Sequence, residues 1–153
     1  MDRTDKKILQ ALQRDCRQSV ADLAERVGLS PSACHRRVKQ LEEQGLIAGY
    51  GAHLDRRKLG YTMEFFVEIS LASQSEDALR AFEDAVRRVP EILECHLMSG
   101  VADYFLRIAA TGPDAYERIH RERLGRLPGV AKIQSSLVLR TIQPWAGYPV
   151  PSD

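Results

Sequence analysis

The sequence of 153 residues predicts an α+β fold in two parts, a winged helix-turn-helix followed by a βαββαβ, ferredoxin-like domain. Residues 19–45 hold two capped helical patterns joined by a very short turn. From residue 61 onward, segments rich in β-forming residues alternate with helical patterns. We expect one domain over residues 1–60, a second over 61–142, and a tail rich in proline and aromatic residues over 143–153.

The first domain is expected to contain three helices. Thr4 can cap a first helix over 5–14. Ser19 and Asp22 form a capping-box pattern at the start of the second helix, and Gly28 suits the left-handed residue after its end. Ser30 then serves as the next N-cap, followed by Pro31 at the first helical position, and Gly45 ends that third helix.

The third helix has an inward face of Cys34, Val38 and Leu41 and an opposite face that is polar and basic. A charged helix face alone is usually a solvated surface, but the caps, the turn length and the preceding helix favour a recognition helix in the major groove of DNA. The side chains suit phosphate and base-edge contacts. The expected DNA-binding residues are Ser30, Ser32, His35, Arg36, Arg37, Lys39 and Gln40.

The segment after Gly45 reads LIAGYGAHLD and is expected to form a small hairpin, the wing, around Gly49 and Gly51. The basic residues Arg56, Arg57 and Lys58 follow as a connector. This connector is either a solvated linker or a phosphate contact.

The second domain is expected to place two helices on one face of an antiparallel sheet. Pro90 ends its first helix, and glycine-containing turns separate the later strands. The expected strands cover residues 63–71, 92–98, 104–110 and 130–139, with a turn at 99–103 and helices at 76–88 and 115–127. In the tail, Trp145 and Tyr148 can dock on a neighbouring subunit.

Charge and cysteine content narrow the class of protein. The net charge is +1, but residues 1–60 carry +4 and residues 61–153 carry −3, so the basic excess lies with the helix-turn-helix. No apolar run approaches the length of a membrane span, and the N-terminus lacks an apolar signal core. Cys16, Cys34 and Cys95 form no CxxC pair, which argues against a disulfide framework or a zinc site and favours a reducing cytoplasm.

With these elements in this order, the chain resembles the Lrp/AsnC family, the feast/famine regulators of bacteria and archaea. The likeness runs from about Thr4 to Ile142, and its strongest pair is the LSPS…RRVKQLEEQGLI helix with the SGVADY turn. The matching segments are TDKKILQALQRDCR, LSPSACHRRVKQLEEQGLI, HLDRRKLG, PEILECHLMSGVADYFLRI and RLPGVAKIQSSLVL.

The resemblance implies a DNA-binding transcriptional regulator whose C-terminal domain, the family's RAM domain, dimerises through its sheet. Dimers of the family often assemble into tetramers or octamers, and many members bind an amino acid between dimers. Gly100 would let the backbone approach this effector, Asp103 would face its ammonium or fix the loop, and Tyr104 would pack beneath it. The implied effector-binding residues are Met98, Ser99, Gly100, Val101, Asp103, Tyr104, Ser135 and Ser136.

Several alternatives remain open. On local sequence alone, the SGVADY segment is a plain β-turn. Some relatives carry an aromatic residue or Thr where this chain has Ser135 and Ser136, so the effector is not identified. The sequence also does not identify the operator, or whether the protein activates or represses transcription. One alternative function is a ligand-sensing module that does not bind DNA, but the basic face of the third helix argues against it.

An enzyme is the main alternative, because siroheme decarboxylases share this layout and use His and Arg around a tetrapyrrole pocket. The sequence has four histidines, none with an evident paired acid, base or nucleophile. We therefore expect no catalytic residue, no metal ligand and no cofactor. The histidines are His35, His53, His96 and His120.

Overall fold

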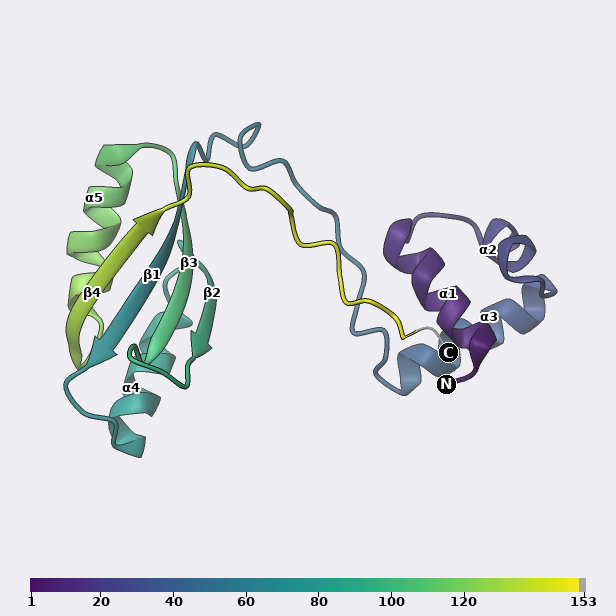
Figure 1. The fold of residues 1–153 in the computed structure, drawn as a ribbon, viewed down its shortest axis with the longest axis horizontal. Helices are drawn as coiled ribbons and strands as arrows, with labels where there is room; N and C mark the ends of the chain where they lie inside the picture. The colour runs from purple at the N-terminus through teal and green to yellow at the C-terminus, as the bar shows by residue number, and fades with distance from the viewer. Residues whose placement is uncertain (152–153) are drawn as a thin grey trace. The chain divides into compact units, whose positions relative to one another are not determined.

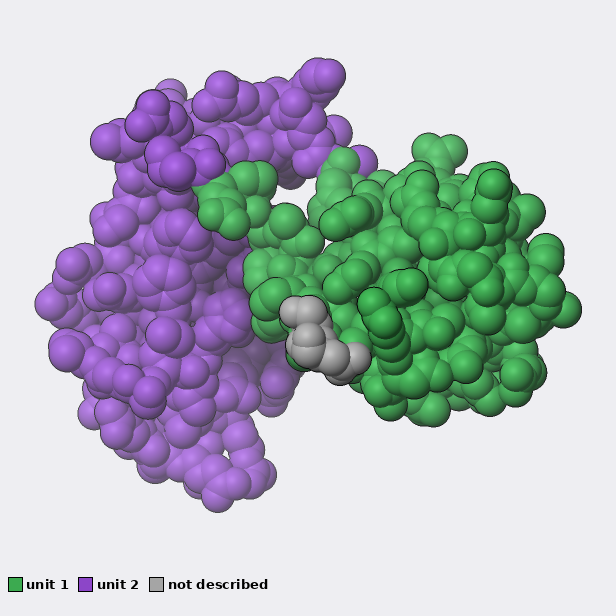
Figure 2. Space-filling view, turned by 45° about the vertical axis from the view of Figure 1, so that its right-hand side comes forward, with its two compact units in different colours: residues 1–53, 143–153 green, residues 54–142 purple. Residues whose placement is uncertain are grey.

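The computed structural model describes residues 1–151, which divide into two compact units (Figure 1). Residues 1–53 and the tail from residue 143 form the helical unit, and residues 54–142 form the sheet unit (Figure 2). No helix within the described residues has the length and apolar character needed to cross a membrane.

The helical unit is a helix-turn-helix preceded by one further helix. Ser19 and Ser30 cap the second and third helices as predicted, each accepting a backbone N–H three residues on. Gly28 adopts φ 74° at the end of the second helix, the left-handed conformation expected there. The elements are α1 (Arg3–Arg14), α2 (Val20–Val27) and α3 (Pro31–Glu43) around a core of Ile8, Ala11, Leu23, Ala24, Val27, Cys34 and Leu41.

The N-cap of α1 is Asp2, so the prediction of Thr4 was wrong. Asp2 and Asp5 form a complete capping box, in which each carboxylate accepts the backbone N–H of the other residue at 2.8 Å. A carboxylate is also favoured at the positive end of the helix dipole, which explains why this pair begins the helix two residues earlier than predicted.

The predicted wing hairpin is absent, because no strand forms between residue 44 and residue 62. Ile47 packs partly on the helical core, but Leu46, Tyr50 and Leu54 remain exposed, which is too little burial to stabilise a two-stranded hairpin. Residues 55–61 form a compact turn instead. The Asp55 carboxylate accepts two backbone N–H groups at its start, and Gly60 adopts φ 89° at its end.

The sheet unit has the predicted βαββαβ order and an antiparallel sheet with strand order β2-β3-β1-β4. Several boundaries differ from the prediction. The first helix and the last strand each end two residues earlier, and the second strand ends one residue earlier. The second helix begins two residues earlier and ends at Glu122, where a 3₁₀ turn follows. The elements are β1 (Met63–Leu71), α4 (Glu76–Val86), β2 (Ile92–Leu97), β3 (Tyr104–Ala110), α5 (Pro113–Glu122), η1 (Leu124–Arg126) and β4 (Val130–Leu137).

The two faces of this sheet differ in chemistry. Alternate residues of β1 and β3 pack with α4 and α5 into one core, which includes Val67, Phe82 and Leu106. The other face bears no helix and carries Phe66 and Phe105, whose rings stack with centroids 5.3 Å apart. We call this second surface the open face.

The tail forms neither helix nor strand over the described residues 143–151, and residues 152–153 lie outside the description. The rings of Trp145 and Tyr148 meet edge to face with centroids 4.9 Å apart, and both side chains are largely exposed. Gly147 lies against the side chain of Gln13 on α1. Docking of these rings on another subunit stays a prediction.

Candidate functional site

The outer face of α3 is exposed and basic. Arg36 makes no ion pair or hydrogen bond within residues 1–151, and Lys39 lies 3.8 Å from Glu43 with both side chains about two-thirds exposed. Such a surface pair contributes little, so both cations can turn to a phosphate at low cost. The predicted residues that are exposed on or before this helix are Ser30, Ser32, His35, Arg36, Lys39 and Gln40.

The N-terminus of α3 can also receive an anion. Ser30 caps the helix, its hydroxyl lies 3.3 Å from that of Ser32, and the first turn contains no acidic residue. The first N–H groups of a helix and its dipole favour phosphate at this end. Phosphate contacts of this kind orient a protein on the duplex, while the side chains farther along the helix reach the bases.

Arg37 differs from the other predicted DNA-binding residues. Its Nη1 donates to Asp2 Oδ2 and to Asp5 Oδ1, each at 2.7 Å, and its side chain is only 28% exposed. The Asp2 hydrogen bond is the main cause that raises the pKa of Arg37, and Asp5 adds to it. The Asp5 backbone N–H, and next Arg37, lower the pKa of Asp2. In this structure the Arg37 guanidinium is directed to α1.

The predicted effector turn joins β2 to β3 and is closed by a hydrogen bond from the Met98 N–H to the Asp103 carbonyl at 2.9 Å. Met98, Ser99, Gly100 and Val101 are exposed, and no atom lies within 4 Å of the position that a Cβ on Gly100 would occupy. The tip of this turn is therefore open to a ligand or to another subunit.

Asp103 is buried at the base of the turn, and both of its carboxylate oxygens are occupied. Oδ2 accepts the Leu71 N–H at 2.6 Å and Oδ1 accepts from the Gln74 side chain at 2.7 Å. The Asp103 N–H donates to the Ile69 carbonyl at 2.9 Å. Of the two roles considered for Asp103, these contacts correspond to fixing the loop.

Tyr104 lies beneath the turn in the core of the sheet unit. Its ring packs on Phe82 with centroids 4.4 Å apart, and its hydroxyl donates to Glu83 of α4 at 2.9 Å. Burial, and next the hydrogen bond to Glu83, raise the pKa of Tyr104 well above its usual range. Tyr104 is 1% exposed, so it supports the turn from below.

The structure does not bring Ser135 and Ser136 to this turn within one chain. Both lie on β4, and β1 separates that strand from β3. Ser135 accepts a hydrogen bond from the Tyr116 hydroxyl on the helix-covered face, whereas Ser136 pairs in register with Phe66 on the open face. A single effector site that includes these serines would need a second subunit.

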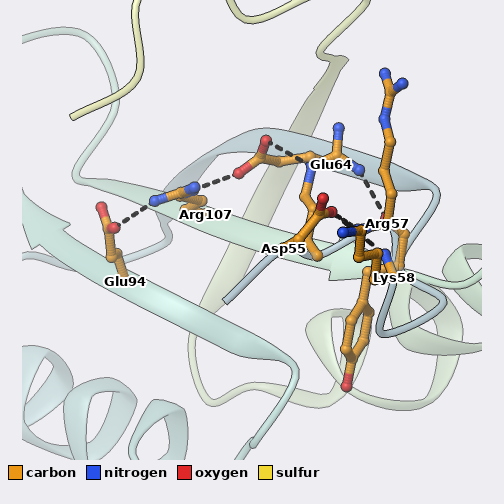
Figure 3. A network of polar contacts seen from close by, with 8 residues as sticks. Asp55, Arg57, Lys58, Glu64, Glu94 and Arg107 are labelled. Carbon is orange, nitrogen blue, oxygen red and sulfur yellow. Dashed lines mark hydrogen bonds and ion pairs between the residues drawn. The ribbon is translucent and has the colours of Figure 1, made fainter. Parts of the chain in front are cut away.

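Sequence reasoning missed a polar network at one end of the open face (Figure 3). Glu64 is 4% exposed and pairs with Arg107 of β3, which also donates to Glu94 of β2 at 2.7 Å. Arg56 of the predicted basic connector reaches the same Glu64 carboxylate at 3.5 Å. The only sequence signal for this network was a charged residue at the same face of three strands.

The three basic residues of the connector differ in their contacts with this network. Arg56 is a structural residue, because it also donates to the Tyr61 carbonyl at 2.7 Å. The backbone N–H groups of Arg57 and Lys58 donate to Asp55, and within residues 1–151 their side chains make no hydrogen bond or ion pair, so these side chains stay available for phosphate. The Arg107 hydrogen bond is the main cause that lowers the pKa of Glu94.

The four histidines lie on separate elements and share no site. His35 is on α3, His53 precedes the compact turn, His96 is on β2 and His120 is on α5. Within residues 1–151, no group of three or more His, Cys, Asp or Glu side chains is arranged to hold a metal ion.

Comparison with known families identifies both halves of the chain. Residues 1–48 match the model for the winged helix-turn-helix DNA-binding domain. Residues 64–145 match the model for the Lrp/AsnC ligand binding domain. The leucine-responsive regulatory protein of Escherichia coli is 42% identical over 143 residues, which cover 94% of this chain and 87% of that protein.

Two solved structures have the same fold. The L-Met complex of a transcriptional regulator from Neisseria meningitidis has a TM-score of 0.93 and 38% identity, covering 97% of this chain and 96% of that one. An AsnC family transcriptional regulator from Agrobacterium tumefaciens has a TM-score of 0.91 and 36% identity, covering 97% of both chains.

Proposed function

Because the chain belongs to the Lrp/AsnC family of transcriptional regulators, we propose that the exposed face of α3 enters the major groove of double-stranded DNA. The observation that carries this proposal is the state of Arg36 and Lys39, two exposed cations on one capped helix with no strong internal partner. Arg36 can form a bidentate pair with a guanine, and Lys39 can bind a phosphate. The exposed Ser30, Ser32, His35 and Gln40 complete the contact surface.

The sheet unit matches the Lrp/AsnC ligand binding domain, and we propose that its ligand is an amino acid. We propose that the effector binds at the tip of the turn formed by Met98, Ser99, Gly100 and Val101, where backbone N–H groups can donate hydrogen bonds to its carboxylate. Asp103 and Tyr104 hold the turn from beneath. L-methionine is the first amino acid to test, because the Neisseria meningitidis regulator is an L-Met complex.

The regulator acts as a homodimer or a larger assembly, with the open face as the dimer contact. The stacked rings of Phe66 and Phe105 form an apolar centre on that face, and Glu68 and Gln134 border it. Ser135, Ser136 and the effector turn would then belong to a site completed by another subunit. We propose tetramers or octamers of such dimers, acting in the cytoplasm.

The binding test uses a duplex selected by the wild-type protein from a random library. Arg36→Ala is expected to cost about 1–3 kcal/mol and to relax selection at one base position. Lys39→Ala is expected to weaken selected and random duplexes alike and to lower the salt slope by about 0.9.

Arg118→Ala is the matched control, since it removes an exposed cation from the sheet unit. Equal affinity of the Arg36→Ala, Lys39→Ala and wild-type proteins for the selected duplex would refute the assigned face. Failure of the wild type to select any duplex would favour the sensing module without DNA binding. An absorbance band after addition of a tetrapyrrole would favour the enzyme alternative.

A further inference from the structure

We propose that Arg37 is a positioning residue that clamps the recognition helix to the start of α1, and that it does not contact DNA. The inference rests on the proposed function of α3. Arg37 lies beside Arg36 in sequence and shares its charge, yet its guanidinium donates to two carboxylates at 2.7 Å. Its side chain is 28% exposed, against 67% for Lys39.

The two carboxylates are themselves held in place. Asp2 and Asp5 exchange hydrogen bonds with each other's backbone N–H groups, so the capping box of α1 fixes where both side chains point. Hydrogen bonds between ionised groups are the stronger kind, and one guanidinium nitrogen here serves both acids. To reach a DNA phosphate, Arg37 would have to break both contacts, and each carboxylate would lose its charged hydrogen-bond donor.

This contact can control the rotation of α3 about its own axis. The inward face of the helix has only Cys34 and Leu41 as fully buried anchors. Arg37 adds a polar anchor near the middle of the helix, next to Arg36 and two residues before Lys39. Base readout needs side chains within a fraction of an ångström of their productive positions, so a small rotation of α3 would misdirect both cations.

The clamp also has an electrostatic consequence. Asp2 and Asp5 lie within reach of the recognition helix and would repel the phosphates of a bound duplex. Arg37 offsets one of their two negative charges, which lowers that repulsion. The effect on DNA affinity of removing Asp2 or Asp5 therefore distinguishes a purely electrostatic role of these acids from the proposed clamp. Simple charge removal strengthens DNA binding, whereas loss of the clamp weakens specific binding.

The test measures the affinity of full-length variants for the selected duplex and for a random duplex at several salt concentrations. Asp5→Asn is expected to lower the affinity for the selected duplex at least about fivefold, the loss that accompanies one damaged base contact, and to leave random-duplex binding unchanged or stronger. Arg37→Gln is expected to show the same loss of selectivity without the decrease in salt slope that Lys39→Gln shows.

The matched control is Asp22→Asn, which removes a first-turn carboxylate from α2 that Arg37 does not touch. It is expected to retain the selectivity of the wild type. The Asp5→Asn and Arg37→Gln double variant is expected to lose no more selectivity than Arg37→Gln alone, because both changes break one contact.

Asp2→Asn provides a further variant that preserves folding, since Asn is also a good N-cap. It is expected to reduce selectivity in the same direction. All variants are compared at a temperature at which circular dichroism shows them folded.

The proposal is overturned if Asp5→Asn binds the selected duplex as tightly as the wild type or more tightly. It is also overturned if Arg37→Gln lowers the salt slope as Lys39→Gln does. These outcomes are distinct from failure of the proposed function, in which the wild-type protein itself selects no duplex.

Discussion

Asp103 accepts the backbone N–H of Leu71 at 2.6 Å, a contact between the end of the β2–β3 turn and the end of β1. Gln74 donates to the other oxygen of the same carboxylate at 2.7 Å. The turn that carries the proposed effector site is therefore anchored by a buried acid whose partners come from one segment 29 to 32 residues earlier.

Asp103→Ala is expected to destabilise the sheet unit by about 1–3 kcal/mol, because the buried Leu71 N–H loses its acceptor. Urea unfolding followed by circular dichroism measures this change. Asp84→Ala, which removes an exposed acid paired with Arg87, is the control and should change stability by less than about 1 kcal/mol. Equal stability of Asp103→Ala and wild type would show that the anchor has no energetic role.

Asp103→Asn separates the two roles of this residue. An asparagine oxygen can still accept the Leu71 N–H, so the turn should keep its shape. If the charge of Asp103 is not used by the effector, calorimetry should show amino-acid binding within a few-fold of wild type. A loss of about 1.5–3 kcal/mol in binding free energy would instead mean that the carboxylate faces the ammonium of the ligand.

Phe66→Arg is expected to prevent association through the open face. The substitution puts a charge against the Phe105 ring at the centre of the proposed dimer contact. Sedimentation at micromolar concentration should show a dimer or larger assembly for wild type and a monomer for the variant. Leu139→Arg, at a largely exposed position beyond β4, is the control and should assemble as wild type does. An associated Phe66→Arg protein would exclude this face.

Thiol labelling should distinguish the three cysteines. Cys16 is exposed, Cys34 is fully buried, and burial is the main cause that raises the pKa of Cys95 to about 11. At pH 8, the folded protein should react rapidly at Cys16 alone, and all three thiols should react in urea. Mass spectrometry of labelled peptides reads out the result. Rapid labelling of Cys34 in the folded state would contradict the core of the helical unit.

Acidification should weaken the polar network of the open face. The folded-state pKa of Glu94 lies below its ordinary value of 4.5, because Arg107 donates to the charged carboxylate. This contribution to stability is therefore present above about pH 4.5 and is lost as the pH falls through the folded-state pKa. Glu94→Gln should lower the urea midpoint at pH 6, and its difference from wild type should be smaller at pH 3. An equal difference at both pH values would contradict the assignment.

Local chemistry made much of the fold predictable from sequence. The caps Ser19 and Ser30 and the glycine after α2 are signals contained within a few residues, and the structure confirms them. The order of strands and helices in the sheet unit followed from β-forming segments separated by helical patterns. The wing hairpin failed because a hairpin needs a buried face, and whether Tyr50 or Leu54 finds one depends on contacts outside the segment.

The sequence predicted which segments form the candidate sites, but it did not predict which residues their side chains contact. The exposed side of α3 follows from helical periodicity, but the partners of Arg37 lie 32 and 35 residues earlier in the chain. The same holds for Asp103, where a turn acid could equally have faced a ligand. No local pattern encodes which distant group reaches a charged side chain, so positioning and contacting residues have the same appearance in sequence.

The most direct test of the account is a footprint of the selected duplex by the wild-type protein, with each amino acid in turn present and absent. The account predicts two protected half-sites about one helical turn, or a multiple of it, apart, and an affinity that at least one amino acid changes by roughly 5- to 150-fold. Absence of a protected site, or a footprint that no amino acid alters, would contradict it.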